Sequence, residues 1–438
     1  MKKVRNPKSA VRNTVTAIIM AAGKGTRMKS DKSKVLHEVC GKPMLGHVID
    51  ACHRAGVKDI VLIAGANYPE LKEFTTNAYP KALIKIVIQK QQLGTAHAIS
   101  TALKAKIKYQ EGILILSGDV PLIEADTIKS AIKEFTTEKT GGMVLISKVE
   151  NPFGYGRIIR DANGFVKAIV EQKDATPQEQ AIEHVNGGVY IFNRDYLKKY
   201  ISMIKMNPLK KEYYLTDIAS IMSKNSIKIR PKTVNYYEVA GINDRIQLME
   251  AGKIKNKKTL EKLAENGITI VDFDTVFIDE NVSIGPDTVI HPFTVIRGIS
   301  RIGKGCNIGP SAHIRSGCVI GDNCRVGNYV EIKKSTLGNN TYVSHLSYIG
   351  DAVLGSNVNI GAGTITCNYD GFKKHETIIG DNVFVGSDTK FVAPVKVGKG
   401  AVIAAGSVIT EDVPADALSV ARARQVNKEK WALKRRKK

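Results

Sequence analysis

The sequence SIGPDTVIHPFTVIRGISRIGKGCNIGPSAHIRSGCVIGDNCRVGNYVEI, residues 283–332, places an aliphatic residue at every sixth position. The series begins at Ile278 and holds its phase to Ile332, and a glycine often follows the aliphatic residue. An α-helix repeats every 3.6 residues and a single strand every two, so neither produces this rhythm. Short strands joined by tight turns produce it when every strand points its aliphatic residue at one axis. The pattern therefore predicts a parallel β-helix of hexapeptide repeats, with about 18 residues in each triangular coil.

The rhythm continues toward the C-terminus with two changes of phase. It shifts by one residue at Leu337 and again at Leu354, is interrupted by TCNYDGFKKHET (residues 366–377), and resumes at Ile379. An ordinary β-sandwich is the alternative architecture, but it would show irregular spacing and longer loops. We expect the chain beyond Pro414 to be helical or disordered.

The composition is that of a globular protein with room for two or three domains. The chain has 438 residues, 43% of them hydrophobic, and it shows neither an apolar run of membrane-spanning length nor a signal-peptide pattern. We therefore expect a cytoplasmic protein with no membrane partner.

The formal net charge of +23 is compatible with nucleic acid, an anionic membrane surface or phosphorylated small molecules as partners. Lysines are spread through every region, and the only run of charge is the terminal KRRKK, residues 434–438. Because aromatic residues are few and no nucleic-acid motif is recognised, we do not expect nucleic acid to be the partner.

The six cysteines show no C-x-x-C pair and no histidine at metal-binding spacing. Cys306 and Cys324 are 18 residues apart, so they should stack on adjacent coils, and Cys318 holds the same hexad position on another face. We interpret them as small packing residues rather than disulfides or metal ligands, as expected in a reducing compartment.

The N-terminal half alternates apolar runs with helical patterns. We expect strands at residues 15–22, 60–64, 84–88, 113–116 and 143–146, and a helix over residues 44–55. This alternation predicts a doubly wound α/β domain with a largely parallel, Rossmann-like sheet. Ligands bind such sheets at the carboxyl ends of the strands. AAGKGTRM (21–28) and LSGDVPL (116–122) each directly follow a strand, so they should border one crevice.

The loop AAGKGTRM brings glycine N–H groups close enough together to contact a phosphate, and Lys24 and Arg27 add positive charge. It is not a Walker A loop, because Gly23 and Gly25 are too close, and it lacks the third glycine of a dinucleotide fingerprint. Lys34 follows in SKVLH, residues 33–37. The combination GxGTRM…KVL resembles the sugar-1-phosphate nucleotidyltransferases, which join a nucleoside triphosphate to a sugar 1-phosphate.

This resemblance implies a nucleotide and sugar site with a metal. Asp119 stands where the family holds Mg²⁺, a hard cation that prefers oxygen ligands, and Asn243 in GINDR resembles the second metal ligand. The implied contacts to nucleotide and sugar are Met20, Ala21, Ala22, Gly23, Lys34, Gln89, Gln92, Gly94, Thr95, Ser117, Gly118, Asp119, Gly156, Glu171, Asn186 and Asn243. In the implied reaction the sugar phosphate attacks the nucleotide α-phosphorus and releases pyrophosphate, with Arg27 and Lys34 as catalytic residues.

Hexapeptide β-helices are often acyltransferases, but some only trimerise or space other domains, so the residues that interrupt the repeat are decisive. Arg315 and Lys333 are 18 apart and each follows an inward aliphatic residue, so we expect a stacked cationic ladder suited to a phosphate. His345 lies beside this ladder, ahead of the loop GAGTITCNYDG, residues 361–371. We therefore interpret His345 as functional rather than structural.

Nearly the whole chain, both halves in order, resembles the bifunctional N-acetylglucosamine-1-phosphate uridyltransferase and glucosamine-1-phosphate acetyltransferase family of bacterial cell-wall precursor synthesis. The resemblance implies that His345 is the general base that deprotonates the sugar amine for attack on acetyl-CoA. It implies further that the amino-sugar phosphate is held by Arg315, Lys333, Tyr348 and Asn359, and acetyl-CoA by Ala362, Asn368, Tyr369, Ser387, Ala405 and Arg422.

The implied function is acetyl transfer from acetyl-CoA to glucosamine 1-phosphate, then uridylyl transfer from UTP to N-acetylglucosamine 1-phosphate. The product, UDP-N-acetylglucosamine, feeds peptidoglycan and lipopolysaccharide synthesis, and the implied assembly is a homotrimer that uses Mg²⁺. We expect a basic tail at residues 1–13, a uridylyltransferase domain at 14–242, a helical linker at 243–267, an acetyltransferase β-helix at 268–414 and a basic tail at 415–438.

One departure from the family is a shorter β-helix, which has fewer hexads between the linker and Arg315, as if one or two coils were missing.

Two other functions remain open. A one-activity nucleotidyltransferase with a regulatory β-helix, as in ADP-glucose pyrophosphorylases, would have no reason to keep His345 and the NYDG loop. A scaffold or RNA-binding protein would not need Asp119 and Asn243 at metal positions.

Overall fold

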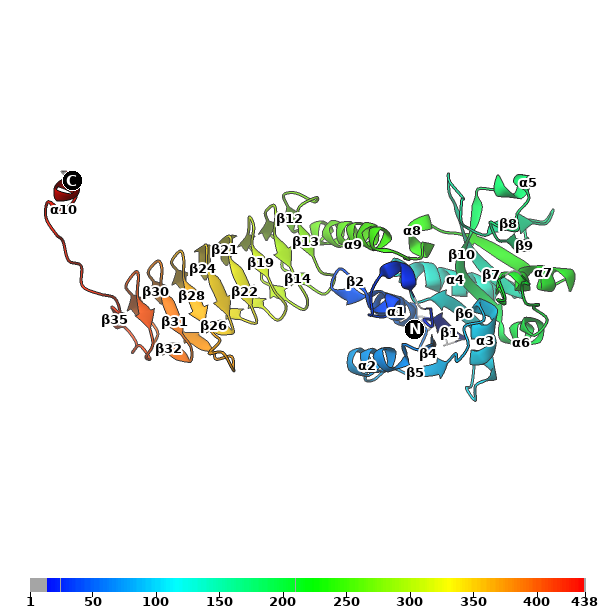
Figure 1. Ribbon diagram of the computed structural model, residues 1–438, viewed down its shortest axis with the longest axis horizontal. Helices are drawn as coiled ribbons and strands as arrows, with labels where there is room; N and C mark the ends of the chain where they lie inside the picture. Colours follow the sequence, from blue (N-terminus) through cyan, green and yellow to red (C-terminus); the bar gives the residue numbers. More distant parts are fainter. Residues whose placement is uncertain (1–13, 24, 209, 437–438) are drawn as a thin grey trace, which may run out of the picture. The chain divides into compact units, whose positions relative to one another are not determined.

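The computed structural model describes residues 14–23, 25–208 and 210–436, and it divides into two compact units between Lys253 and Ile254 (Figure 1). The expected basic tail at residues 1–13 and Lys24 of the glycine-rich loop lie outside the described residues. No helix in the described part of the chain is long and apolar enough to cross a membrane.

The N-terminal unit is built on one mixed sheet, whose main path runs β11-β7-β10-β6-β1-β4-β5. β1 pairs in parallel with β4 and β6, whereas β10 runs antiparallel between β6 and β7. The α/β prediction is therefore confirmed, with one long antiparallel strand inside a largely parallel sheet. The strands are β1 Val15–Met20, β4 Asp59–Ala64, β5 Ile84–Ile88, β6 Gly112–Ser117, β7 Gly142–Lys148, β8 Arg157–Arg160, β9 Val166–Val170, β10 His184–Asn193 and β11 Ile229–Thr233, with a small hairpin of β2 Glu38–Val39 and β3 Lys42–Pro43.

Helices cover both faces of this sheet, which makes it doubly wound. Within β1, Ala17 and Ile19 pack with α1, α2 and α4 on one face, while Ile18 packs with α3, α6 and α7 on the other. The period of two along a strand explains this division. The helices are α1 Met44–Arg54, α2 Tyr68–Ala78, α3 Thr95–Lys104, α4 Ala125–Glu138, α5 Pro177–Gln180, α6 Arg194–Ile201, α7 Asp217–Lys224 and α8 Tyr236–Val239, with 3₁₀ turns at Thr26–Met28 and Lys34–Leu36. α9, Arg245–Glu265, occupies most of the segment expected as a linker.

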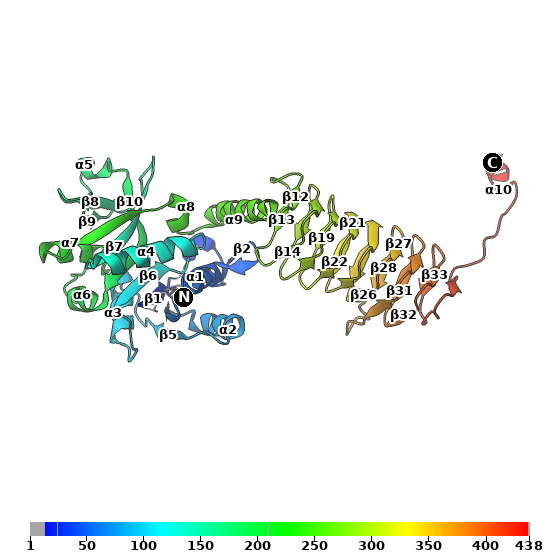
Figure 2. The same cartoon turned by 180° about the vertical axis from the view of Figure 1, so that it is seen from behind.

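The C-terminal unit confirms the β-helix, because successive short strands belong in turn to three parallel sheets (Figures 1 and 2). The first sheet contains β12 Thr269–Ile270, β15 Val289–Ile290, β18 Asn307–Ile308, β21 Arg325–Asn328, β24 Tyr342–His345, β27 Asn359–Ile360, β30 Phe384–Val385, β33 Val402–Ile403 and β35 Leu418–Ser419. The second contains β13 Phe277–Ile278, β16 Val295–Ile296, β19 His313–Ile314, β22 Glu331–Lys333, β25 Tyr348–Gly350, β28 Ile365–Cys367, β31 Lys390–Val392 and β34 Val408–Ile409. The third contains β14 Ser283–Ile284, β17 Arg301–Ile302, β20 Val319–Ile320, β23 Thr336–Leu337, β26 Ala352–Leu354, β29 Thr377–Ile379 and β32 Val395–Val397.

The aliphatic residues of the hexads form the core of the β-helix. Ile308, Val326 and Val343 occupy register-matched positions on adjacent coils of the first sheet, and all three are buried. Cys306 and Cys324 are buried on adjacent coils as expected, and all six cysteines of the chain are free thiols within the described residues. The six-residue repeat therefore predicted the core residues of the β-helix correctly.

The coils continue beyond Pro414, where the sequence led us to expect only helix or disorder. β35 pairs in parallel with β33, and the Val402 amide donates to the Ala417 carbonyl at 2.8 Å. The expectation is wrong for this strand because the last strand of a sheet presents unpaired N–H groups, which a further strand satisfies. A short helix, α10 Trp431–Arg436, follows.

Candidate functional site

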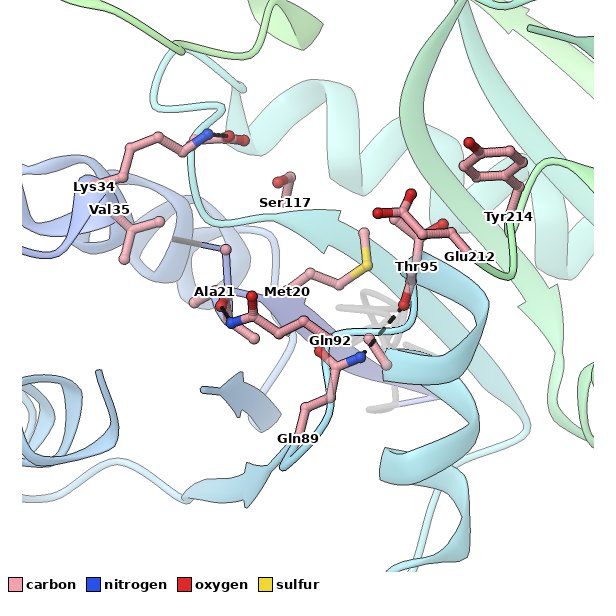
Figure 3. A pocket seen from close by; sticks show the side chains of 15 residues that line it. Met20, Ala21, Lys34, Val35, Gln89, Gln92, Thr95, Ser117, Glu212 and Tyr214 are labelled. Atoms are coloured by element: carbon pink, nitrogen blue, oxygen red, sulfur yellow. Dashed lines mark hydrogen bonds and ion pairs between the residues drawn. The ribbon is translucent and has the colours of Figure 1, made fainter. Parts of the chain in front are cut away.

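Two adjoining cavities lie in the N-terminal unit, at the carboxyl ends of β1 and β6, and Figure 3 shows the first of them. The first has a volume of about 340 Å³ and the second about 670 Å³. Met20, Thr95, Ser117 and Tyr214 line both, so they form one continuous crevice. This is the location at which doubly wound sheets bind ligands.

Most of the predicted nucleotide residues meet in the first cavity. Gln89 is buried there and its side-chain amide donates to the Gly94 carbonyl at 3.4 Å, and the Gln92 amide donates to the Ala22 carbonyl (Figure 3). These bonds fix both side chains along one wall. The predicted residues that line this cavity are Met20, Ala21, Ala22, Gly23, Lys34, Gln89, Gln92, Gly94, Thr95, Ser117 and Asp119.

Two glycines of the motifs are required by close approaches of the chain. Gly25 has a φ of +62°, and a Cβ there would lie 2.5 Å from Cβ of Lys34. Gly94 has a φ of +97°, and a Cβ there would lie 2.6 Å from the Tyr213 carbonyl oxygen. Any side chain would therefore clash as well as strain the backbone.

Arg27, Lys34, Asp119 and Asn243 form one polar cluster beside the first cavity. The Lys34 ammonium donates to the Asp119 carboxylate and, at 3.3 Å, to the Asn243 side-chain oxygen. Arg27 Nη2 donates to the same Asn243 oxygen at 2.8 Å. The structure thus brings together the two predicted catalytic cations and the two predicted metal ligands.

The cluster fits a Mg²⁺ ion. Asp119 and Asn243 present oxygen atoms to the same ammonium group, so both lie within reach of a single cation at the Lys34 position. Mg²⁺ takes oxygen ligands and is commonly held by one or two protein groups together with substrate phosphates. No group of three or more His, Cys, Asp or Glu side chains that could hold a metal occurs among the described residues. Two protein oxygen ligands, with the remaining positions left for substrate phosphates and water, therefore fit Mg²⁺.

The second cavity contains the predicted sugar contacts Glu171 and Asn186. Burial raises the pKa of the Glu171 carboxyl, although a 3.0 Å hydrogen bond from the Thr216 hydroxyl opposes the shift. Asn186 donates to the Tyr190 hydroxyl at 2.7 Å. Gly156 lies outside the lining but its carbonyl accepts from the Asn186 amide at 2.8 Å. Gly118 likewise does not line either cavity and instead donates to the Met20 carbonyl.

The sequence analysis missed the segment 212–216. Helix α7 begins later, at Asp217, and Glu212 and Tyr214 line the first cavity.

The sequence analysis also missed Arg157, a buried guanidinium that donates to the Gln172 side-chain oxygen at 2.6 Å. Gln172 in turn accepts from the Gly154 amide, and both residues line the second cavity. Neighbouring polar and aromatic residues ahead of a helix are too common to single out such positions.

In the C-terminal unit, five predicted residues follow strands of the first sheet at its corner with the second sheet. His345 ends β24 and is exposed, and no described residue hydrogen-bonds to its imidazole. The Gly363 amide donates to the His345 carbonyl, which places the Ala362 turn on the next coil. The residues along this corner are His345, Ala362, Ser387, Ala405 and Arg422.

A second group lies at the corner between the second and third sheets. Arg315 and Lys333 stack on adjacent coils as predicted, since the Arg315 amide donates to the Ile332 carbonyl at 2.8 Å. The Arg315 guanidinium, however, forms a 3.0 Å ion pair with Glu331. The nearby Lys333 ammonium lowers the pKa of Lys374, a cation that we did not predict.

The other residues predicted for acetyl transfer do not all lie at the same corner of the β-helix. The Asn368 amide donates to Asp351 at 2.5 Å and to the Tyr348 hydroxyl at 3.4 Å. The Asp351 amide donates to the Lys333 carbonyl at 3.0 Å, so Tyr348, Asn368 and the adjoining Tyr369 belong with Lys333. Asn359 instead begins β27, after the corner between the third and first sheets. A single chain therefore does not bring His345, the cationic ladder and Asn359 to one place.

Comparison with known proteins identifies the family. Residues 16–229 match the nucleotidyl transferase family, and residues 301–395 match the family described as GMPPB C-terminal domain. The chain is 43% identical to the bifunctional protein GlmU of Trichlorobacter lovleyi, over 96% of this chain and 98% of that protein. It is 44% identical to GlmU of Thermoanaerobacter pseudethanolicus over 97% and 99%, and 42% identical to GlmU of Geotalea uraniireducens over 97% and 100%. The chain belongs to the GlmU family.

Membership of the GlmU family confirms the bifunctional interpretation of the sequence. The protein is an acetyltransferase and a uridylyltransferase of UDP-N-acetylglucosamine synthesis. The match with the T. lovleyi protein extends over 456 aligned positions, whereas this chain has 438 residues, so that GlmU has residues with no counterpart here.

Proposed function

We propose that the two activities occupy separate sites, with uridylyl transfer in the N-terminal crevice and acetyl transfer on the corners of the β-helix. The observation that carries the first assignment is the cluster in which Lys34 and Arg27 reach the oxygens of Asp119 and Asn243 beside the first cavity. On this proposal residues 14–242 form the uridylyltransferase domain and 243–267 the linker. The acetyltransferase domain begins at residue 268 and extends past the expected end at residue 414 to include β35, so the basic tail is the part of 415–438 that follows β35.

For uridylyl transfer, Gln89 and Gln92 orient the nucleotide, and Glu171 and Asn186 orient the amino sugar in the adjoining cavity. This arrangement aligns a sugar-phosphate oxygen with the α-phosphorus of UTP, and pyrophosphate leaves. Arg27 and Lys34 offset the negative charge that develops on the phosphate oxygens. Asp119 and Asn243 would hold Mg²⁺, which when bound neutralises phosphate charge and fixes the substrate geometry.

For acetyl transfer, the His345 imidazole accepts a proton from the amine of glucosamine 1-phosphate. The nitrogen forms a bond to the carbonyl carbon of acetyl-CoA as the bond from that carbon to sulfur breaks, and the departing thiolate takes up the proton from the imidazolium and leaves as coenzyme A. Arg315, Lys333 and Tyr348 bind the sugar phosphate. Ala362, Ser387, Ala405 and Arg422 form the wall for acetyl-CoA along the corner that His345 occupies, with Asn368 and Tyr369 contributed at the other corner.

We also propose a homotrimer, because the predicted acetyl-site residues lie on different corners of one chain. Copies packed side by side along the β-helix would bring the His345 corner of one chain against the Lys333 corner of the next. Exposed apolar side chains occur on the outer faces of the coils, among them Phe277, Val319, Tyr342 and Phe384. The six free thiols agree with the proposed cytoplasmic location.

The test is one reaction mixture of the full-length protein with glucosamine 1-phosphate, acetyl-CoA, UTP and Mg²⁺. Free thiol should appear before pyrophosphate, because the acetylated sugar is the substrate of the second step. Pyrophosphate release from N-acetylglucosamine 1-phosphate alone should need no acetyl-CoA. If thiol is never released while pyrophosphate is, the β-helix is regulatory and the acetyl-site assignment is wrong.

A further inference from the structure

Glu212 is an acidic residue in a cavity that must accept a triphosphate. It lines the first cavity beside Gly94, Thr95 and Tyr214, and Figure 3 shows its carboxylate pointing into the space next to Thr95. None of the functions derived above uses it. Its position therefore needs a reason of its own.

The backbone on either side of Glu212 is held against the turn that precedes α3. The Tyr213 amide donates to the Leu93 carbonyl at 2.8 Å, and the Ala96 amide donates to the Tyr213 carbonyl at 2.9 Å. The Leu215 amide donates to the Thr95 hydroxyl at 2.9 Å. The stem is fixed too, since a Cβ at Gly94 would lie 3.1 Å from Cβ of Glu212. The carboxylate is therefore aimed by tertiary contacts.

Within the described residues, the Glu212 carboxylate has no ion-pair partner and accepts no hydrogen bond. Asp119, the other carboxylate that lines this cavity, is paired with Lys34. An ionised carboxylate only accepts hydrogen bonds, so its partner must be a donor. The partner must come either from water or from the substrate.

Phosphate groups are excluded as that partner, because like charges repel at close range. The cations that suit phosphates, Arg27 and Lys34, lie instead at the Asp119 end of the cavity. Glu212 lines the first cavity beside Thr95 and Tyr214, two residues that also line the second cavity, so its carboxylate lies on the side of the nucleotide cavity that opens toward the sugar cavity. Both substrates carry uncharged hydroxyl donors on their sugar rings, which a carboxylate at this position could accept from.

We propose that Glu212 is a specificity-determining residue of the uridylyl site, whose carboxylate accepts a hydrogen bond from a sugar hydroxyl of the substrates. The inference rests on the proposed uridylyl site. Ribose and the amino sugar are the two possible sources of the hydroxyl. A hydrogen bond to a charged group contributes about 1.5–3 kcal/mol, which corresponds to a preference of roughly 10- to 150-fold over a substrate that lacks the hydroxyl.

The experiment compares kcat/KM ratios in the wild type, Glu212→Gln and Glu212→Ala. One arm uses UTP against its 2′-deoxy and 3′-deoxy forms, and the other uses N-acetylglucosamine 1-phosphate against its 3-deoxy, 4-deoxy and 6-deoxy forms. In Glu212→Ala, the preference for the hydroxyl-bearing substrate should fall by about tenfold or more in one arm. Glu212→Gln keeps an acceptor oxygen but loses the charge, so its preference for the hydroxyl-bearing substrate should lie between those of the wild type and Glu212→Ala.

The matched control is Glu183→Gln, an exposed surface change in the same unit, which should leave every ratio unchanged. Calorimetry establishes that each variant is folded. A change confined to the nucleotide arm assigns the hydroxyl to ribose, and one confined to the other arm assigns it to the amino sugar. If all ratios match the wild type, the proposal is overturned, even where total activity changes. Failure of the wild type to release pyrophosphate would instead overturn the proposed function.

Discussion

The side-chain oxygen of Asn243 accepts a 2.8 Å hydrogen bond from Arg27, a residue 216 positions earlier in the chain. The Ile242 amide donates to the Asp119 carbonyl at 2.9 Å, and Gln247 accepts from the Asn243 amide at 2.7 Å. These bonds hold the end of the N-terminal unit against the glycine-rich loop. The polar cluster of Arg27, Lys34, Asp119 and Asn243 is therefore complete only when residues from both ends of this unit are in place.

Asp119→Ala should separate the two activities. Loss of this carboxylate removes one of two proposed Mg²⁺ ligands, so pyrophosphate release should fall by roughly 10²-fold or more. Thiol release should persist, because the acetyl site does not contain the ion. Parallel assays of thiol and pyrophosphate provide the measurement, with Asp126→Asn on the surface of α4 as a control. Loss of both activities in a folded variant would contradict the assignment of separate sites.

His345→Ala should lower acetyl-transfer turnover by about 10²–10⁴-fold, the usual contribution of a general base, and leave uridylyl transfer unchanged. The KM for glucosamine 1-phosphate should change little, since Arg315 and Lys333 bind its phosphate. His313→Ala, another exposed histidine of the β-helix, is the control. A variant that melts early, or acetylates normally, would argue that His345 is structural.

Dilution should affect the two activities differently. If the acetyl site is shared between copies, its specific activity should fall as the trimer dissociates, whereas uridylyl transfer should stay constant. Light scattering over the same concentration range gives the oligomeric state. Full acetyl transfer by a monomer would rule out the shared site.

Glu171→Gln should stabilise the protein while impairing sugar binding. Burial raises the pKa of Glu171 in the folded state, so its ionisation costs stability above that pKa. The cost disappears as the pH falls below about 4.3, the ordinary value for glutamate. Calorimetry should therefore show a Tm gain at pH 7, about 2–4 °C per kcal/mol, that vanishes near pH 4. A gain that persists unchanged in acid would exclude ionisation as the cause.

The sequence by itself determined the β-helix, its core and most of the residues that line the first cavity. The hexad phase decides which side chains point inward, because backbone pairing between adjacent coils repeats the same geometry on each turn. The glycine-rich loop was recognisable for a similar reason: Gly25 must adopt a left-handed conformation beside Lys34. Such constraints are local or periodic, so they are visible in the order of residues.

Only the tertiary structure decided which of those residues meet. It placed Glu212 and Tyr214 in the first cavity through hydrogen bonds to the turn at Leu93 and Thr95. It also divided the acetyl-site residues between two corners and the start of β27, and it added β35 beyond the last hexad that we recognised. These features depend on hydrogen bonds between segments distant in sequence, whose partners are fixed by folding and leave no regular pattern along the chain.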